Sequence, residues 1–345
     1  MNKIFQQNLF SKNHFIEIDA MRGLCAILVM VYHYSKYIQS VNHSSNLYFD
    51  YAEFGKYGVH LFFIISGFLI FMTLEKSKHT KDFIVSRFSR LYPAYWLCMT
   101  LTAIVITISP YYTYSPVTTG QFLANLTMFQ HWMHIPDMDG IYWTLAVELC
   151  FYILIFIVFI FKKQKSIEQI SAIWLAMMLA LFLSVQNNLA PAINYYYYVP
   201  LLKNGNLFIA GILFYRLMKK EGGNRSYILL ILTLAVHFII NSTEESLVVS
   251  IFYLIFYLFV IGKLGFLRNK ILYFFGIICY TLYLLHQYIG YEIINYLDAQ
   301  GIENTFYKIM ITAVLMIGLA SLVTFIVERP AMKFIRRKLI QPKNP

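Results

Sequence analysis

The chain has 345 residues, of which 59% are hydrophobic and only 13% are charged, and its formal net charge is +11. Charged residues make up about a quarter of a typical soluble domain. The composition therefore excludes a soluble enzyme and indicates an integral membrane protein. Because nearly all of the basic residues lie in alternate connections between apolar stretches, the positive charge does not indicate a nucleic-acid partner.

Apolar stretches of roughly spanning length follow one another along the whole chain, separated by short polar connections. We predict an all-α, polytopic membrane protein with about ten transmembrane helices. The first stretch follows about twenty polar and aromatic residues and has no small-residue cleavage site, so we expect a retained helix and not a signal peptide. The predicted spans are 21–40, 57–74, 92–109, 141–161, 168–186, 204–218, 226–241, 246–262, 271–296 and 305–327.

The basic residues predict the topology. With ten spans, 24 of the 28 Lys and Arg residues fall on one side of the membrane, and only Lys36, Lys56, Lys203 and Lys308 fall on the other. The longest connection of the second side, 110–140, contains no Lys or Arg. By the positive-inside rule, both termini are predicted to be cytoplasmic.

Arg22 and His33 lie at the two ends of an otherwise mostly apolar run in the first span. Eleven residues make about three helical turns, so both side chains lie on one face, about 16 Å apart along the axis. His33 is then about halfway through the hydrocarbon, where an ionisable group is costly and is a candidate for function. The alternative is a neutral imidazole that forms a hydrogen bond between helices.

Two further spans carry ionisable residues at a similar predicted depth. Glu148 lies about 10 Å below one boundary in the fourth span, and His286 lies about 20 Å from the other boundary in the ninth. Two imidazoles and a carboxylate at one level suit proton transfer, with a histidine as base and a carboxylate that orients it. Structural hydrogen bonding between helices remains the alternative for Glu148.

The segment 81–93, after the second span, has apolar residues spaced for an interfacial helix. Arg87 and Arg90 lie three residues apart and project together, as a pair of guanidinium groups that matches phosphate oxygens. The alternative is contact with anionic lipid head groups. Ser66 and Gly67 in the second span are small enough to admit a closely packed helix or a ligand, and helix packing is the default interpretation. No third ligand accompanies His131 and His134, so we predict no metal site.

Several motifs together resemble acyltransferase family 3, membrane enzymes that transfer acyl groups, mostly acetyl from acetyl-CoA, to carbohydrates and related molecules. The motifs occur in family order over nearly the whole chain, which we therefore interpret as a single domain, 1–345, without a fused extracytoplasmic domain. They are IDAMRGL followed by His33, GVHLFFIISGFLI at 58–70, RFSRLYP at 87–93, WTLAVE at 143–148, YTLYLLH at 280–286 and Glu328-Arg329-Pro330.

The resemblance implies roles for individual residues. The arginine and histidine of the family's first helix correspond to Arg22 and His33, its paired arginines to Arg87 and Arg90, and its tryptophan and glutamate to Trp143 and Glu148. Two positions depart from the family pattern: Thr144 stands where serine is usual, and His60 stands where an acidic or amide residue is common.

We therefore expect an O-acetyltransferase of the bacterial cytoplasmic (inner) membrane, in contact with membrane lipids, that uses acetyl-CoA as donor and a carbohydrate or glycolipid as acceptor. His33, Glu148 and His286 are the predicted catalytic residues, and Arg22, Arg87 and Arg90 are predicted to bind the donor. A homo-oligomer is compatible with the sequence. The rival hypothesis is a proton-coupled transporter or exporter, because buried His and Glu residues also form proton relays.

Overall fold

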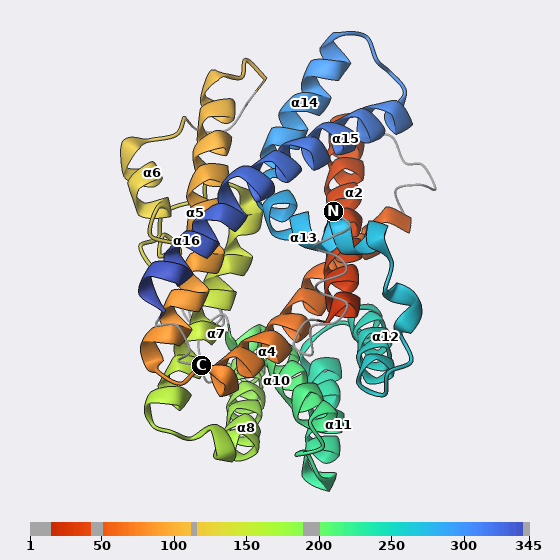
Figure 1. Cartoon of the computed structure of the whole chain (residues 1–345). Helices are drawn as coiled ribbons and strands as arrows, with labels where there is room; N and C mark the ends of the chain where they lie inside the picture. Colours follow the sequence, from red (N-terminus) through yellow and green to blue (C-terminus); the bar gives the residue numbers. More distant parts are fainter. Residues whose placement is uncertain (1–14, 43–50, 112–115, 189–200, 341–345) are drawn as a thin grey trace. The chain divides into compact units, whose positions relative to one another are not determined.

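The computed structural model describes residues 15–42, 51–111, 116–188 and 201–340, and within these ranges every regular element is a helix (Figure 1). The predicted all-α fold is confirmed to that extent. The helices group into two compact units. Unit 1 comprises Met1–Gly58, Ile84–Trp143 and Phe266–Pro345, and unit 2 comprises Val59–Phe83 and Thr144–Gly265.

In the described ranges, six helices are long and apolar enough to cross a membrane, and a bent pair of helices would make a seventh. The multi-pass character is therefore confirmed, whereas the count of ten stays a prediction. The remaining predicted spans are also helical. Helix α2 (Ile16–Asn42) carries four charged residues, α10 (Leu201–Met218) is interrupted by polar residues such as Lys203 and Asn204, and α11 (Asn224–Ile240) has only 17 residues. Residues 1–14 and 341–345 lie outside the described ranges, so the side on which the termini lie also stays a prediction.

Helices α2 and α13 (Lys270–Leu285) form the centre of unit 1 and approach each other at two glycines. A Cβ atom on Gly23 would overlap the backbone of Gly276, and one on Gly276 would overlap the carbonyl of Asp19. Two helices come this close only where both lack side chains at the crossing. The crossing therefore fixes the register of α2 against α13.

The stretch 271–296, which the sequence predicts as one apolar span, is two helices. Helix α13 ends at Leu285, α14 runs from Tyr288 to Ala299, and the two are bent by 75° (Figure 1). Neither Pro nor Gly occurs at the break, so the usual sequence signal for it is absent. His286 and Gln287 form the bend itself.

Two other helices of unit 1 are longer than the sequence predicts. Helix α5 (Thr80–Ile108) runs without interruption through Pro93, so the arginine segment and the following span are one helix. Helix α15 (Thr305–Val323) continues through a π-helical turn, η5 (Thr324–Glu328), into α16 (Arg329–Leu339). Pro330 has no N–H group and cannot complete an α-helical hydrogen bond, which is consistent with a wider turn just before it.

Unit 2 contains α4 (Gly58–Lys76), α7 (Trp143–Ile160), α8 (Ile167–Gln186), α10, α11 and α12 (Thr243–Val260). A Cβ atom on Gly67 of α4 would overlap the carbonyl of Phe208, and one on Gly211 of α10 would overlap the carbonyl of Ile64. The predicted close helix contact at Gly67 is therefore confirmed.

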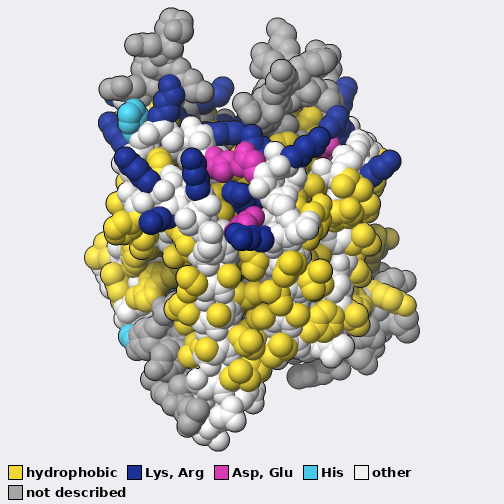
Figure 2. Space-filling view, turned by 90° about the horizontal axis from the view of Figure 1, so that it is seen from below, with side chains coloured by type: hydrophobic (Ala, Val, Ile, Leu, Met, Phe, Trp, Pro, Cys, Tyr) yellow, Lys and Arg dark blue, Asp and Glu magenta, His cyan; other side chains and the backbone are white. Residues whose placement is uncertain are grey.

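Many large hydrophobic side chains are exposed, and they make up much of the face in Figure 2, as expected for a lipid-facing surface.

Candidate active site

His33 and His286 lie side by side in unit 1. The Nε2 atom of His286 is 3.0 Å from Nδ1 of His33, and the ring centroids are 5.0 Å apart. His286 is fully buried, whereas His33 is partly exposed. The sequence predicts a similar depth for these residues, and the structure places them in direct contact.

Backbone carbonyls determine which ring nitrogens of the two neutral imidazoles carry hydrogen. A carbonyl oxygen only accepts hydrogen bonds, so Nδ1 of His286 must donate to the carbonyl of Tyr283, 2.8 Å away. Its Nε2 is then an acceptor. The Nδ1 of His33, 3.0 Å from the carbonyl of Val29, must carry the hydrogen that it shares with that carbonyl and with His286. The lone pair of His33 is therefore on Nε2, as in a general base.

The glycine crossing of α2 and α13 explains why the two rings meet. His33 follows Gly23 by ten residues, and His286 follows Gly276 by the same number. At 1.5 Å per residue, each histidine is about 15 Å along its helix from the crossing. Equal offsets on two helices that run in the same direction bring the side chains to the same level.

The loop before α7 stabilises the bend that carries His286. The carboxylate of Asp139 accepts hydrogen bonds from the backbone N–H of Ile141 at 3.3 Å and of Tyr288 at 3.1 Å. The hydroxyl of Tyr142 donates to the carbonyl of Leu284 at 3.1 Å. Breaking a helix leaves backbone donors and acceptors without partners, and these two side chains supply partners on both sides of the break.

Asp139 is completely buried, and burial raises the pKa of its carboxyl group to about 7. The backbone N–H donors oppose this shift because they stabilise the ionised form. Both oxygens accept hydrogen bonds, and the carboxylate lies at the N-terminal end of α14, where negative charge is favourable. Asp139 is therefore a structural acceptor at the bend, near His286 but not bonded to it.

The predicted donor-binding residue Arg90 forms an ion pair with Glu328 of the π-helical turn. Glu328 is almost fully buried, and its other oxygen, Oε2, lies 3.4 Å from the hydroxyl of Thr324. The hydroxyl of Thr324 in turn lies 2.5 Å from that of Thr281 on α13. Arg90 is thus joined to the histidine-bearing helix through a continuous polar chain.

Three further arginines lie in the same part of unit 1. Arg22 is 3.9 Å from Asp19 on its own helix. Arg22 and Arg90 both lie near enough to the buried thiol of Cys279 to interact with it electrostatically. Arg87 donates to the hydroxyl of Ser86 at 3.3 Å. Arg336 of α16 donates to the hydroxyl of Ser89 at 3.0 Å. The positive charges of Arg87 and Arg90 lie near enough to repel that of Arg336. We refer to Arg22, Arg87, Arg90 and Arg336 as the arginine cluster.

Glu148, the third predicted catalytic residue, belongs to unit 2. Its Oε1 accepts hydrogen bonds from the hydroxyls of Ser66 and Tyr152, each at 2.9 Å. Among the described residues, Oε2 accepts no hydrogen bond. Two donors on a single oxygen hold the carboxyl group in one orientation and leave the second oxygen able to accept a proton or a hydrogen bond.

His60, whose role the sequence leaves in doubt, also lies in unit 2. Its Nε2 is 2.9 Å from a carboxylate oxygen of Glu245 at the start of α12. His237 of α11 lies beside it, with ring centroids 5.9 Å apart. His60 therefore connects three helices of unit 2.

The structure brings His33 together with His286, places Arg22 and Arg90 near Cys279, and places Arg87 and Arg90 near Arg336. No role for Asp139, Tyr142 or Arg336 is predicted from the sequence, and Glu328 stands there only as part of a motif. An Asp one residue before a short helical turn is a cap signal that was present in the sequence. The pairing of Glu328 with Arg90 spans 238 residues and has no local signal.

Comparison with known proteins shows which family the chain resembles. A family model described as an acyltransferase domain, family 3, matches residues 15–327. A peptidoglycan O-acetyltransferase of Listeria monocytogenes is 26% identical over 163 residues, which cover 42% of this chain and 24% of that protein. Nodulation protein 10 of Rhizobium leguminosarum is 24% identical over 173 residues, covering 42% of this chain and 44% of that protein. The match thus spans less than half of either relative, and no solved structure matches the chain.

Proposed function

We propose, because this chain belongs to acyltransferase family 3, that it is an O-acetyltransferase moving acetyl from acetyl-CoA to a hydroxyl group of a cell-surface carbohydrate. The observation that carries the proposal is the contact between His33 and His286. The name of the Listeria relative supports acetyl as the acyl group and a sugar polymer as the acceptor. We further propose ten spans in a bacterial inner membrane, with both termini cytoplasmic.

The arginine cluster is the proposed site for the phosphates of the donor. Guanidinium groups match phosphate oxygens in geometry and charge, and the arginine cluster provides four of them in one part of unit 1. Arg22 and His33 lie on one face of α2, about 16 Å apart. An extended pantetheine arm can bridge this distance and bring the thioester to the histidine pair.

In the proposed reaction, Nε2 of His33 removes the proton from the acceptor hydroxyl as its oxygen attacks the thioester carbonyl. The tetrahedral intermediate then expels the CoA thiolate, and the imidazolium returns the proton to the sulfur. The products are an O-acetyl ester and free CoA. His286 stabilises the transient imidazolium because its Nε2 accepts the Nδ1 hydrogen of His33. Glu148 is proposed as a further catalytic residue, and its carboxyl group is oriented by Ser66 and Tyr152.

The test compares a deletion strain of the host complemented with the wild-type gene, with His33→Ala or with His286→Ala at equal membrane expression. NMR spectra of the surface polysaccharides report O-acetyl esters. We expect wild type to restore the esters and His33→Ala not to restore them. Ester signals of wild-type intensity in the His33→Ala strain would contradict the role of His33.

The donor site is tested separately on purified protein. Arg22→Lys keeps the charge but loses the planar fork, so we expect the apparent KM for acetyl-CoA to rise about tenfold. The matched control is Arg225→Lys, a conservative change at an arginine outside the arginine cluster. Equal acetyl-CoA affinity in wild type and Arg22→Ala would contradict the proposed role of Arg22 in donor binding.

A further inference from the structure

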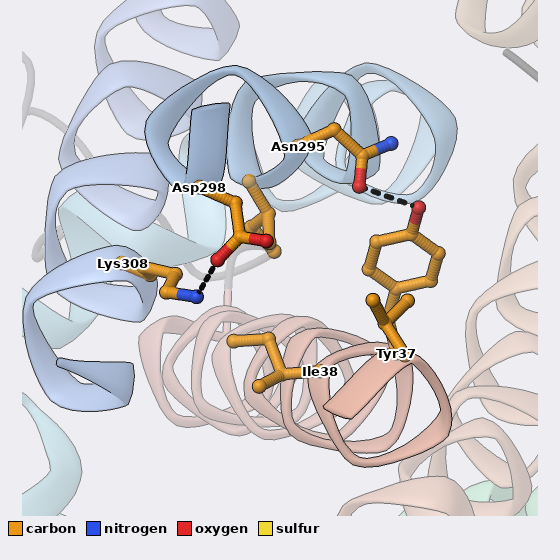
Figure 3. Close-up of a pocket in the computed structure, with 7 residues that line it drawn as sticks. Tyr37, Ile38, Asn295, Asp298 and Lys308 are labelled. Carbon is orange, nitrogen blue, oxygen red and sulfur yellow. Dashed lines mark hydrogen bonds and ion pairs between the residues drawn. The ribbon is translucent and has the colours of Figure 1, made fainter. Parts of the chain in front are cut away.

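A pocket lies in unit 1 on the far side of His33 from Arg22. It is formed by α2, α14 and α15 and is a small, partly open pocket with an interior of about 10 Å³, enough for one hydroxyl group or water molecule. Figure 3 shows Tyr37 and Ile38 from α2 facing Asn295 and Asp298 from α14, with Lys308 from α15 beside Asp298. This pocket is outside the histidine pair and the arginine cluster.

The polar groups of the pocket include both donors and acceptors. The hydroxyl of Tyr37 donates to the side-chain oxygen of Asn295 at 2.8 Å, which leaves the amide nitrogen of Asn295 as a donor. Lys308 forms an ion pair with Asp298. Ile38 and Ile294 supply an apolar wall. Such a lining suits a ligand with hydroxyl groups along its edge and C–H groups on its face.

The charges of the pocket cancel. The side chain of Lys308 is only 2% exposed, whereas that of Asp298 is 47% exposed. A buried ammonium group is costly unless an anion accompanies it, and Asp298 supplies that anion. Because the positive and negative charges offset each other, the pocket favours an uncharged ligand.

Paired side chains from α2 and α14 connect the histidine pair to the pocket. Tyr37 follows His33 by one helical turn on the same face of α2, and its ring stacks on that of Tyr291 with centroids 4.0 Å apart. Tyr37 then bonds to Asn295 at the pocket. A ligand in the pocket is therefore about one to two turns, roughly 6–12 Å, from His33.

We propose that this pocket is the acceptor subsite, which binds one edge of an uncharged, hydroxyl-rich sugar while a neighbouring hydroxyl of the same chain reaches His33. The inference rests on the proposed acetyltransferase function and specifies its acceptor. Donor and acceptor thus occupy opposite ends of α2, and the histidine pair lies between them.

The probes are the uncharged oligosaccharides chitopentaose and maltopentaose, tested for binding to purified wild-type protein in nanodiscs and for transfer from acetyl-CoA. Asn295→Leu removes the amide, and Tyr37→Phe removes one hydroxyl while it keeps the ring stack. The matched control is Tyr296→Phe, the loss of a hydroxyl from an exposed tyrosine of the same helix. Acetyl-CoA affinity is measured for every variant as a check on the fold.

We expect wild type to bind at least one oligosaccharide, and both pocket variants to weaken binding and raise the acceptor KM about three- to tenfold. The control and all acetyl-CoA affinities should not change. Binding of neither sugar by wild type, or equal binding by Asn295→Leu, would overturn the acceptor subsite. Absence of esters in the host complemented with wild type would instead overturn the proposed function, so the two failures are distinguishable.

Discussion

Gly23 and Gly276 lie backbone against backbone, and each precedes one histidine of the pair by ten residues. The contact between the two imidazoles therefore depends on two positions without side chains about 15 Å away. A catalytic pair can be disrupted by such a remote change because the helices transmit the displacement as rigid rods.

Gly276→Ala is predicted to separate α2 from α13 and to reduce transfer at least about tenfold, since misplacement by about 1 Å can cost a hundredfold in rate. The matched control is Gly318→Ala on α15, where a Cβ atom meets nothing within 4 Å. The measurement is kcat per folded protein, with folding assessed by thermal unfolding. Full activity of Gly276→Ala would show that the crossing does not set the histidine register.

His286→Ala is predicted to lower kcat about ten- to a thousandfold, less than His33→Ala, because it leaves the base in place but removes the acceptor of its Nδ1 hydrogen. The double variant should be no slower than His33→Ala alone, since residues that act as a unit are not additive. Single-turnover rates with acetyl-CoA measure this. Additive losses in the double variant would mean that the two rings act independently.

Arg90→Met is predicted to destabilise the protein by about 3–5 kcal/mol, because it leaves the buried carboxylate of Glu328 without its cation. The double variant Arg90→Met/Glu328→Leu removes both charges and should regain most of that stability. Thermal unfolding in detergent distinguishes these outcomes. If Arg90 also contacts the donor, the restored double variant will still bind acetyl-CoA more weakly than wild type.

Asp139 is predicted to make stability depend on pH. Its folded-state pKa of about 7 lies above the ordinary value of 3.8, so its contribution is fully present below pH 4 and is lost as the pH rises through 7. Asp139→Asn keeps an acceptor for one backbone N–H and does not titrate. Relative to this variant, wild type should lose about 2–5 °C in Tm between pH 5 and pH 8. Parallel Tm curves would contradict the assignment.

Ser66→Ala and Tyr152→Phe each remove one of the two hydroxyls that orient Glu148. Each is predicted to lower kcat by about two- to tenfold without changing the affinity for acetyl-CoA. Glu148→Gln should have a larger effect, because it replaces the carboxylate itself. Wild-type kcat in Glu148→Gln would exclude a catalytic role for the carboxyl group.

The depth of residues in helices could be predicted from the sequence, because axial position is proportional to residue number. The sequence therefore predicts a similar level for His33 and His286, and the structure places their rings in contact. Arg87 and Arg90 are three residues apart on α5, and this short spacing predicts that their side chains project together. Their predicted role in donor binding, with Arg22 of α2, stays a prediction.

Contacts between distant segments could not be predicted in the same way. The bend at His286 contains neither Pro nor Gly. It is stabilised instead by Asp139 and Tyr142, which lie about 150 residues earlier in the chain. The partner of Arg90 could not be predicted from the sequence either, since a glutamate at position 328 does not indicate which of the many arginines it pairs with. Glu148 shares the predicted depth of the histidines, but equal depth does not determine which side chains a residue contacts.

The π-helical turn at Thr324–Glu328 has a consequence for the helix that follows it. A turn of this kind is equivalent to a one-residue insertion in an α-helix, which advances the phase of all later residues by about 100°. Deleting one residue there would restore an ordinary α-helix and still leave α15 in place. It would rotate Arg336 away from Ser89, so the orientation of the C-terminal helix depends on a single extra residue.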